Sequence, residues 1–316
     1  GEPYPVRGLM ILGGSPVLSF PDSKSWREAY KKLDCLIVLD RYFTEDARYA
    51  DVVFPACSLF EVPKAVPGPE GPHIVEPLIE PVGESKNDVL IMGAIAKKLG
   101  FGDKLPQTEE ELRSWLLSGT APYAGDFGTS ADQKKEKHYK KYETGELRAD
   151  GKPGFPTPSG KLEICSTILE ENGFVPYPEY KDVRSIPELA GKEYPFTMTS
   201  GARSNNRMGV FGANLDKIAE IEPYPFVDIN AEEAKEIGIE DGDMVKVITP
   251  FADGTFKAKI RGIARHAIHI PHGGGSAYMA EPWKNGNVND LCSLDYADPM
   301  TGFVLIKSVP CRVEKV

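Results

Sequence analysis

The first 55 residues carry the pattern of a small parallel α/β unit. Apolar runs at Val6–Leu12 and Cys35–Leu39 lack polar alternation, and Asp51–Phe54 forms a third short run. Between the first two runs, Ser25–Leu33 repeats apolar positions at helical spacing. Strands without alternation, separated by a helix, indicate a parallel sheet covered on both faces.

The last third of the chain follows a different pattern, typical of a β-barrel with one short helix. Asn230 is a good helix N-cap, and Gly238 ends the helix where a left-handed residue costs least. Val245 and Val247 alternate with Lys246, as in a half-buried strand. Such a barrel could also bind nothing in particular, because fold does not determine function. The expected segments are strands at Phe196–Ser200, Met244–Ile248, Phe256–Ile260 and around His269–His272, a helix at Ala231–Glu236, a tight turn at Asp241–Gly242 and a terminal strand at Val309–Val313.

The middle of the chain is proline-rich and partly helical. Val62–Pro81 is expected to be extended, whereas Lys86–Leu99 and Thr108–Leu117 read as helices, the second with a capping box. We therefore expect an α/β lobe at residues 1–62, a helical and irregular middle region with a linker at 63–192, and a barrel domain at 193–316.

Composition narrows the function classes. The formal net charge is −10, and the one basic run, at residues 134–137, stands among acids, so binding of nucleic acid by bulk electrostatics is not expected. No stretch reaches the length of a membrane span, and the first residues do not resemble a signal peptide. The five cysteines are scattered and never spaced Cys-x-x-Cys, so they predict neither a disulfide framework nor a metal site.

Two loops should meet at the carboxyl edge of the predicted sheet, where ligands of α/β proteins bind. Gly13-Gly-Ser15 offers a backbone that can approach a phosphate. Asp40 ends the second strand, and its carboxylate could accept two adjacent donors from a guanine edge. The alternatives are a simple glycine turn and a solvated acid at a strand end.

The barrel region supplies further candidates. Arg203 and Arg207 follow its first strand and could pair with a pyrophosphate, or simply be solvated loop arginines. His272 opens the string His-Gly-Gly-Gly-Ser, as in the oxyanion loop of esterases. The chain lacks the Gly-x-Ser-x-Gly elbow that an esterase requires, which argues against that activity.

Several ordered motifs resemble the molybdopterin-dinucleotide (bis-MGD) oxidoreductases, of the dimethyl sulfoxide reductase and formate dehydrogenase type. Val38–Pro55 is similar to a long family motif, Val-x-Asp-x-Phe-x-Thr through Ala-Asp-Val-x-Leu-Pro. Thr157–Glu163 matches Thr-Pro-Ser-Gly-Lys-x-Glu. Asn230 to Val245 follows the spacing Asn-x-x-x-Ala-x-x-x-Gly-Ile-x-x-Gly-x-x-Val, and Asn289-Asp-Leu291 precedes Asp298-Pro299.

The resemblance implies a Rossmann-like α/β lobe followed by a double-psi β-barrel, together cradling molybdopterin guanine dinucleotide with molybdenum or tungsten. Gly13, Asp40 and Thr44 would bind one guanine, together with Ser15, which replaces the family's usual asparagine. Gly201 would allow close backbone approach. The residues implied for the other arm or its pterin are Arg203, Arg207, His272 and Asn289.

The same resemblance implies that this chain is the C-terminal portion of a molybdopterin-dependent oxidoreductase, either a fragment or one subunit of a split enzyme. The metal ligand and any iron–sulfur cluster would lie in the N-terminal half, as would an export signal. We therefore expect no catalytic or metal-ligating residue in this chain and no turnover in isolation. The expected partners are that N-terminal half and an electron-transfer subunit. The alternative is a non-catalytic scaffold or binding subunit that has lost the cofactor.

Overall fold

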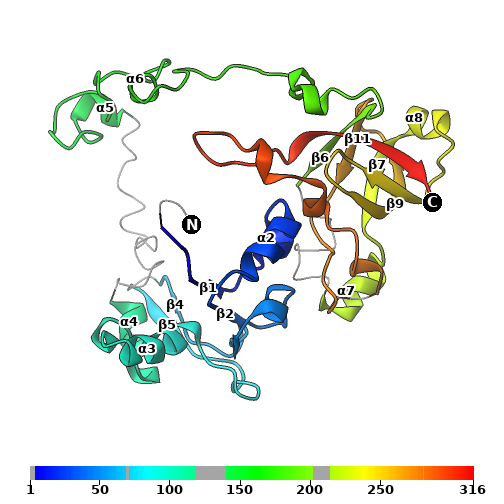
Figure 1. Cartoon of the computed structure of the whole chain (residues 1–316). Coiled ribbons are helices and arrows are strands. Elements are labelled where there is room, and N and C mark those ends of the chain that lie inside the picture. Colours follow the sequence, from blue (N-terminus) through cyan, green and yellow to red (C-terminus); the bar gives the residue numbers. More distant parts are fainter. Residues whose placement is uncertain (1–3, 69–70, 119–139, 202–213, 280) are drawn as a thin grey trace. The chain divides into compact units, whose positions relative to one another are not determined.

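The chain divides into two compact units. In this computed structural model (Figure 1), residues 4–68, 71–118, 140–201, 214–279 and 281–316 are described. One unit comprises residues 1–58, 83–88 and 182–316, and the other comprises residues 59–82 and 89–181. The division into three domains stays a prediction, and the α/β lobe and the barrel fall within the same compact unit.

The N-terminal lobe is built on a three-stranded parallel sheet, as the apolar runs predict. Strand β1 (Gly8–Leu12) pairs with β2 (Cys35–Asp40), which pairs with β3 (Val52–Pro55). The expected helix is α2 (Ser23–Tyr30), and a short helix α1 (Pro16–Ser19) interrupts the loop after β1. The parallel pairing is confirmed, and the Rossmann-like assignment stays a prediction.

The two faces of this sheet differ in burial. Leu36 and Val38 point into a buried apolar cluster, whereas Cys35 and Ile37, on the opposite face, are only half-buried. Both faces of the sheet were expected to be buried. The face that carries Leu36 and Val38 is fully buried, whereas the face that carries Cys35 and Ile37 is only partly covered. Apolar runs without alternation do not distinguish a fully buried face from a half-buried one.

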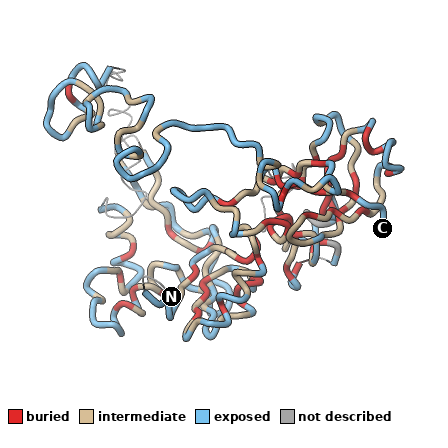
Figure 2. Tube along the Cα trace, turned by 45° about the horizontal axis from the view of Figure 1, so that its top comes forward, coloured by how far each residue is buried: buried red, intermediate tan, exposed pale blue. Residues whose placement is uncertain are grey.

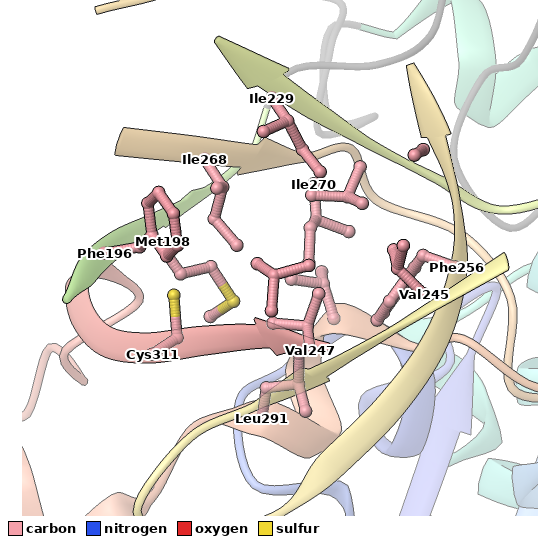
Figure 3. Close-up of a cluster of buried hydrophobic side chains, with 14 of the residues drawn as sticks. Phe196, Met198, Ile229, Val245, Val247, Phe256, Ile268, Ile270, Leu291 and Cys311 are labelled. Carbon is pink, nitrogen blue, oxygen red and sulfur yellow. The ribbon is translucent and has the colours of Figure 1, made fainter. Parts of the chain in front are cut away.

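The C-terminal region is a closed six-stranded barrel, in the order β10-β6-β11-β8-β9-β7. Its strands enclose an apolar core of side chains from every strand, including Phe196, Ile229, Val247 and Phe256 (Figure 3). The barrel prediction is confirmed, and its double-psi connectivity stays a prediction. The strands are β6 (Phe196–Ser200), β7 (Phe226–Asn230), β8 (Met244–Ile248), β9 (Asp253–Arg261), β10 (Ala267–Ile270) and β11 (Lys307–Lys315).

Local signals in the barrel act as the sequence predicts. Asn230 accepts hydrogen bonds from the backbone amides of Glu232 and Glu233 at the start of α8 (Ala231–Glu236), and its own amide donates to the Ile263 carbonyl. Gly238, at φ +69°, follows the helix in the left-handed region. One side chain thus caps a helix and ties it to the segment after β9.

The second unit contains the two expected helices, α3 (Asp88–Lys98) and α4 (Glu109–Leu117). The Thr108 hydroxyl accepts from the Glu111 amide, but the Glu111 carboxylate accepts from the Gln107 amide rather than from Thr108. The helix start is therefore confirmed with a variant of the expected capping box.

The remaining elements are short. None of the helices in the part of the chain that the structure describes combines the length and apolar character needed to cross a membrane. These elements are strands β4 (Lys64–Val66) and β5 (His73–Val75), helices α5 (Lys141–Thr144), α6 (Thr167–Glu171) and α7 (Asp216–Ile221), and 3-10 helices η1 (Asp46–Tyr49), η2 (Gly102–Lys104), η5 (Val183–Ser185), η6 (Pro187–Leu189), η8 (Glu281–Trp283), η9 (Val288–Leu291) and η10 (Leu294–Tyr296).

The long segment between β10 and β11 completes the core of the lobe. Met279 and Trp283 belong to the same buried cluster as Ile11, Val17 and Leu36. Figure 2 shows that buried positions also recur along the strands near the C-terminus. The lobe therefore takes part of its hydrophobic core from residues that lie more than 200 positions further along the chain.

Candidate functional site

The carboxyl edge of the lobe sheet brings the two predicted loops together. The Gly13 amide donates to the Leu39 carbonyl at 2.9 Å, which places the glycine loop beside Asp40 at the end of β2. Gly13 has a φ of +58°, and a side chain added there would meet no atom within 4 Å. Open space and a left-handed backbone are the conditions in which glycine admits a ligand close to the main chain.

Asp40 is a partly buried carboxylate. Its Oδ1 accepts from the Tyr42 amide at 3.0 Å. Burial raises the pKa of Asp40 above its ordinary value, against the backbone hydrogen bonds from Tyr42 and Arg41 and the charge of Arg41. Donors supplied by a ligand would offset this desolvation and favour the charged form.

Asp88 is a neighbour of Asp40 that the sequence reading did not single out. Burial raises the pKa of Asp88, and the charges of Arg41 and Asp40 act on it in opposite directions. Two carboxylates therefore face this edge of the sheet. Their separation in the sequence gave no signal that they would meet, because the segment that carries Asp88 returns beside β3, where Lys86 bridges to Ala56.

Ser15 and Thr44 are buried and engaged inside the lobe. The Ser15 hydroxyl donates to Asp46, and the Thr44 hydroxyl accepts from the Ala47 amide at 3.2 Å. Asp46 also accepts from the Tyr30 hydroxyl at 2.7 Å and from the Val17 amide at 3.1 Å. Asp46 thus ties the glycine loop, α1 and α2 to the segment that follows Thr44, a role that the sequence did not predict.

On the barrel, Gly201 follows β6 with a φ of +112°. Its carbonyl accepts from His269 Nε2 at 3.2 Å, and His269 Nδ1 lies 3.0 Å from Asp228 Oδ2. The predicted contact residue Gly201 is therefore held by a histidine from a neighbouring strand. The predicted residues Arg203 and Arg207 lie outside the described residues.

His272 and Asn289 border one cavity of about 390 Å³. Residues of the lobe line its other side, including Ser19, Phe20 and Trp26, and the segment before β11 contributes Phe303 and Val304. The structure thus brings two of the predicted barrel residues to one hollow that the lobe helps to form. Its lining is mostly apolar, as is typical of pockets for flat organic ligands.

Asn289 is 1 % exposed and also joins the barrel segment to the lobe. Its amide donates to the Leu18 carbonyl at 2.7 Å, while its backbone carbonyl accepts from the Asp22 amide at 2.8 Å. Asn287 acts in the same way, since its amide donates to the Ser23 hydroxyl at 3.0 Å. The amide of Asn289 is therefore already in use as a donor.

The glycines after His272 are explained by packing. A Cβ on Gly274 would come within 2.7 Å of the Asn285 carbonyl, and one on Gly275 within 2.6 Å of the Asn287 side chain. Both glycines have positive φ. Gly274 and Gly275 therefore belong to a turn that is tightly packed against residues 285–287.

The described residues do not include any group of three or more His, Cys, Asp or Glu side chains arranged to hold a metal ion. The groups described above are a carboxylate and an open glycine turn at the sheet edge, and an amide at the border of the cavity.

Two family descriptions match the chain on either side of its middle region. Residues 2–98 match the molybdopterin oxidoreductase family, and residues 197–310 match the molydopterin dinucleotide binding domain. The chain belongs to the molybdopterin oxidoreductase family. The family expected from the sequence motifs is thereby confirmed.

Curated relatives extend this similarity over most of the chain. The F420-dependent formate dehydrogenase subunit alpha of Methanocaldococcus jannaschii is 31% identical over 84% of this chain and 38% of its own length. The probable oxidoreductase YyaE of Bacillus subtilis is 30% identical over 95% of this chain and 44% of its own length. The chain thus spans less than half the length of these relatives.

Among solved structures, acetylene hydratase from Pelobacter acetylenicus has a similar fold. The TM-score is 0.78 at 23% sequence identity, covering all of this chain and 45% of the hydratase. This similarity shows that the chain and the matched part of the hydratase share a fold.

Proposed function

We propose that this chain forms the part of a molybdenum or tungsten oxidoreductase that binds the guanine dinucleotide arms of a molybdopterin cofactor. The observation that carries the proposal is the sheet edge at which Asp40 stands beside the open, left-handed Gly13. A partly buried carboxylate and an unobstructed backbone turn are the two groups that a guanine and its linked phosphate require.

The carboxylate suits guanine because of its donor and acceptor pattern. The N1–H and the exocyclic amine of guanine are adjacent donors, and a carboxylate has two acceptor oxygens and no donor. Burial raises the pKa of Asp40, so two ligand donors would stabilise the charged form. The second carboxylate, Asp88, increases the acceptor character of this edge.

The other arm, or its pterin, is proposed to occupy the cavity bordered by His272 and Asn289. Gly201 would admit it close to the barrel backbone, and Arg203 and Arg207 would neutralise its phosphates. The mostly apolar lining of the cavity suits a flat ring, and polar groups at its rim would fix the orientation of that ring.

When bound, the cofactor supplies the metal and the redox chemistry. The residues of this chain bind and orient its arms and exclude water from them. We propose that the metal ligand and any iron–sulfur cluster belong to the N-terminal portion of the longer protein, and that electrons pass to a further subunit. The isolated chain is then inactive.

A second candidate is a scaffold or binding subunit without cofactor. The observation that favours it is the internal use of three predicted contact groups, the hydroxyls of Ser15 and Thr44 and the amide of Asn289. In this alternative the contacts of Ser15 and Thr44 hold the loops of the lobe, the contact of Asn289 holds the lobe to the barrel, and none of the three groups has a ligand.

The test is an Asp40→Asn substitution, which keeps the size of the side chain but replaces one acceptor oxygen by a donor. Loss of a charged bidentate contact should weaken binding of guanosine diphosphate about 10- to 100-fold by calorimetry. Asp34→Asn is the matched control, because Asp34 lies at the opposite end of β2, where it is exposed and pairs with Arg7.

The same variants should be co-expressed with the N-terminal portion and assayed for guanine and for molybdenum or tungsten. We expect cofactor in the wild-type and Asp34→Asn complexes and less in Asp40→Asn. A stable wild-type complex that contains neither guanine nor metal would favour the scaffold candidate instead.

A further inference from the structure

His269 has an acceptor at each of its ring nitrogens. Nδ1 lies 3.0 Å from the Asp228 carboxylate and Nε2 lies 3.2 Å from the Gly201 carbonyl. A neutral imidazole has one N–H and one bare acceptor nitrogen, so it can satisfy only one of these oxygens. Only the doubly protonated ring donates to both.

The charges around this ring support its protonation. Asp228 is 7 % exposed, and its other carboxylate oxygen lies 2.9 Å from Arg261 Nε. The hydrogen bond to Asp228 is the main cause that raises the pKa of His269 above 6.5, against burial and the charge of Arg261. The single negative charge of Asp228 therefore faces two positive charges, those of Arg261 and the protonated His269. These three side chains together carry one net positive charge.

Strand pairing places further groups in one row with this ring. His269 pairs with Asp228 on β7 and with Thr199 on β6, while Lys259 pairs with Asp228 from the other side. Lys307 on β11 follows, because it pairs with Thr199. The neighbours Ile268 and Ile270 point into the barrel core (Figure 3), so the alternation of the strand directs His269 to the outer surface.

The row is positively charged on balance. Lys259 is compensated by Glu222, whose carboxylate lies 2.8 Å from its amine. Arg261 and His269 share Asp228, and Lys307 approaches Gly201, so that a Cβ built on that glycine would lie 4.0 Å from Lys307 Cε. Among the described residues, the net positive charge of this row lies at the end of β6, next to Gly201, which is predicted to allow close approach of a ligand to the backbone.

We propose that His269 is a positioning residue whose doubly protonated ring fixes the Gly201 carbonyl and makes this edge of the barrel a binding site for a phosphate or pyrophosphate group. The inference rests on the proposed function and names the part of the cofactor that this edge receives. Protonation of the His269 imidazole then determines both the orientation of the Gly201 carbonyl and the net charge at this edge of the barrel. Anion affinity at this edge should follow the ionisation of His269.

The first test measures the ring directly, without any ligand. Long-range nitrogen-15 NMR of the wild-type chain should show both ring nitrogens of His269 protonated at pH 6, with a titration midpoint above 6.5. Asp228→Asn should lower that midpoint. A ring protonated on one nitrogen at pH 6 would overturn the inference, whatever the protein binds.

The second test measures binding of inorganic pyrophosphate by the wild-type chain and by His269→Gln. Removing one nearby charge should weaken binding about fivefold at pH 6. The ratio between the two proteins should fall towards one as the pH is raised from 6 to 9, because the wild-type ring loses its charge as the pH passes its pKa. Taking the ratio cancels the ionisation of the probe itself. His269→Lys keeps a charge and should weaken binding less, without this pH dependence.

His266→Gln is the matched control, since His266 precedes the same strand, is exposed and contacts Glu233. It should bind pyrophosphate like the wild type. An equal ratio at pH 6 and pH 9 for His269→Gln would overturn the inference. Failure of the Asp40 experiment with normal pyrophosphate behaviour would instead remove the guanine assignment and leave the phosphate edge in place.

Discussion

The barrel and the lobe bury their interiors by different means. The barrel closes on itself, and its core is formed by apolar side chains from all six strands. The lobe has three strands, a buried carboxylate at Asp46, and a core completed by Met279 and Trp283 from beyond β10. The barrel is therefore a self-sufficient support, whereas the lobe depends on polar contacts and on the barrel's own loops.

The barrel core therefore contributes mainly to stability, whereas the polar contacts of the lobe fix the geometry of the candidate binding loops. Hydrophobic burial is non-directional and tolerates exchange of one apolar side chain for another of similar volume. A buried polar network fixes loop geometry because every donor needs its acceptor. The loops that carry Gly13 and Asp40 belong to the second kind of structure, which is suited to holding a ligand in one orientation.

The largest effect should come from Trp283→Ala. Loss of this fully buried side chain should lower the free energy of unfolding by about 4 kcal/mol. Hydrogen exchange should report the loss first at β1 and β2 of the lobe, and less at β8 of the barrel. Trp283→Phe should cost less, although it also removes the indole N–H that donates to the Glu222 carbonyl. Equal loosening of both regions would show that the barrel is not self-sufficient.

Asp46→Ala should rank second, at about 3 kcal/mol, because it leaves the Ser15 hydroxyl, the Tyr30 hydroxyl and the Val17 amide without their acceptor. Urea unfolding measures this cost. Ser15→Ala is the control that removes one of the three donors, so it should cost less than half as much. A mild effect of Asp46→Ala would mean that water replaces the carboxylate and that the lobe is less tightly organised.

Asn289→Ala should cost about 2 kcal/mol, since the buried Leu18 carbonyl loses its donor. The exposed Asn285 offers the matched control, and Asn285→Ala should be neutral within about 0.5 kcal/mol. Thermal unfolding of both variants measures the difference. Equal melting temperatures for the two variants would indicate that Asn289 is retained for its place at the cavity rather than for joining the lobe to the barrel.

The smallest effect concerns pH. The pKa of His269 is raised in the folded protein, so its stabilising contribution is complete below the unfolded value near 6.5 and is lost as the pH rises through the folded value. His269→Gln should therefore lose about 1 kcal/mol at pH 6 and little at pH 9. A constant difference across this range, measured by urea unfolding, would contradict the sign of the shift.

Local sequence signals were enough to predict the barrel. Residues Phe196–Ser200, Ala231–Glu236 and Met244–Ile248 have the expected bounds, because capping, alternation and turn glycines act over a few residues. The half-covered sheet and the helix α1 were not predicted. Both depend on which distant segments pack against the lobe, and apolar runs alone carry no such information.

The candidate site shows the same limit of local reasoning. Gly13 and Asp40 could be placed together because parallel strands share a carboxyl edge. The engagement of Ser15 by Asp46, and of Asn289 by Leu18, could not be foreseen, since those partners lie 31 and 271 positions away. Asp88 and His269 were missed for a similar reason: each acquires its role from strand pairing or chain return rather than from a motif.

Closure of the barrel has a practical consequence for handling the isolated chain. A closed ring of strands offers no backbone edge to a neighbour, whereas the lobe sheet, as described, has two edge strands, β1 and β3. Val6, just before β1, and Leu12, at its end, are exposed. Unpaired edges of this kind recruit strands from other molecules. Concentrated solutions of the chain should therefore self-associate through the lobe, and a lysine placed near β1 would be the first change to make for crystallisation.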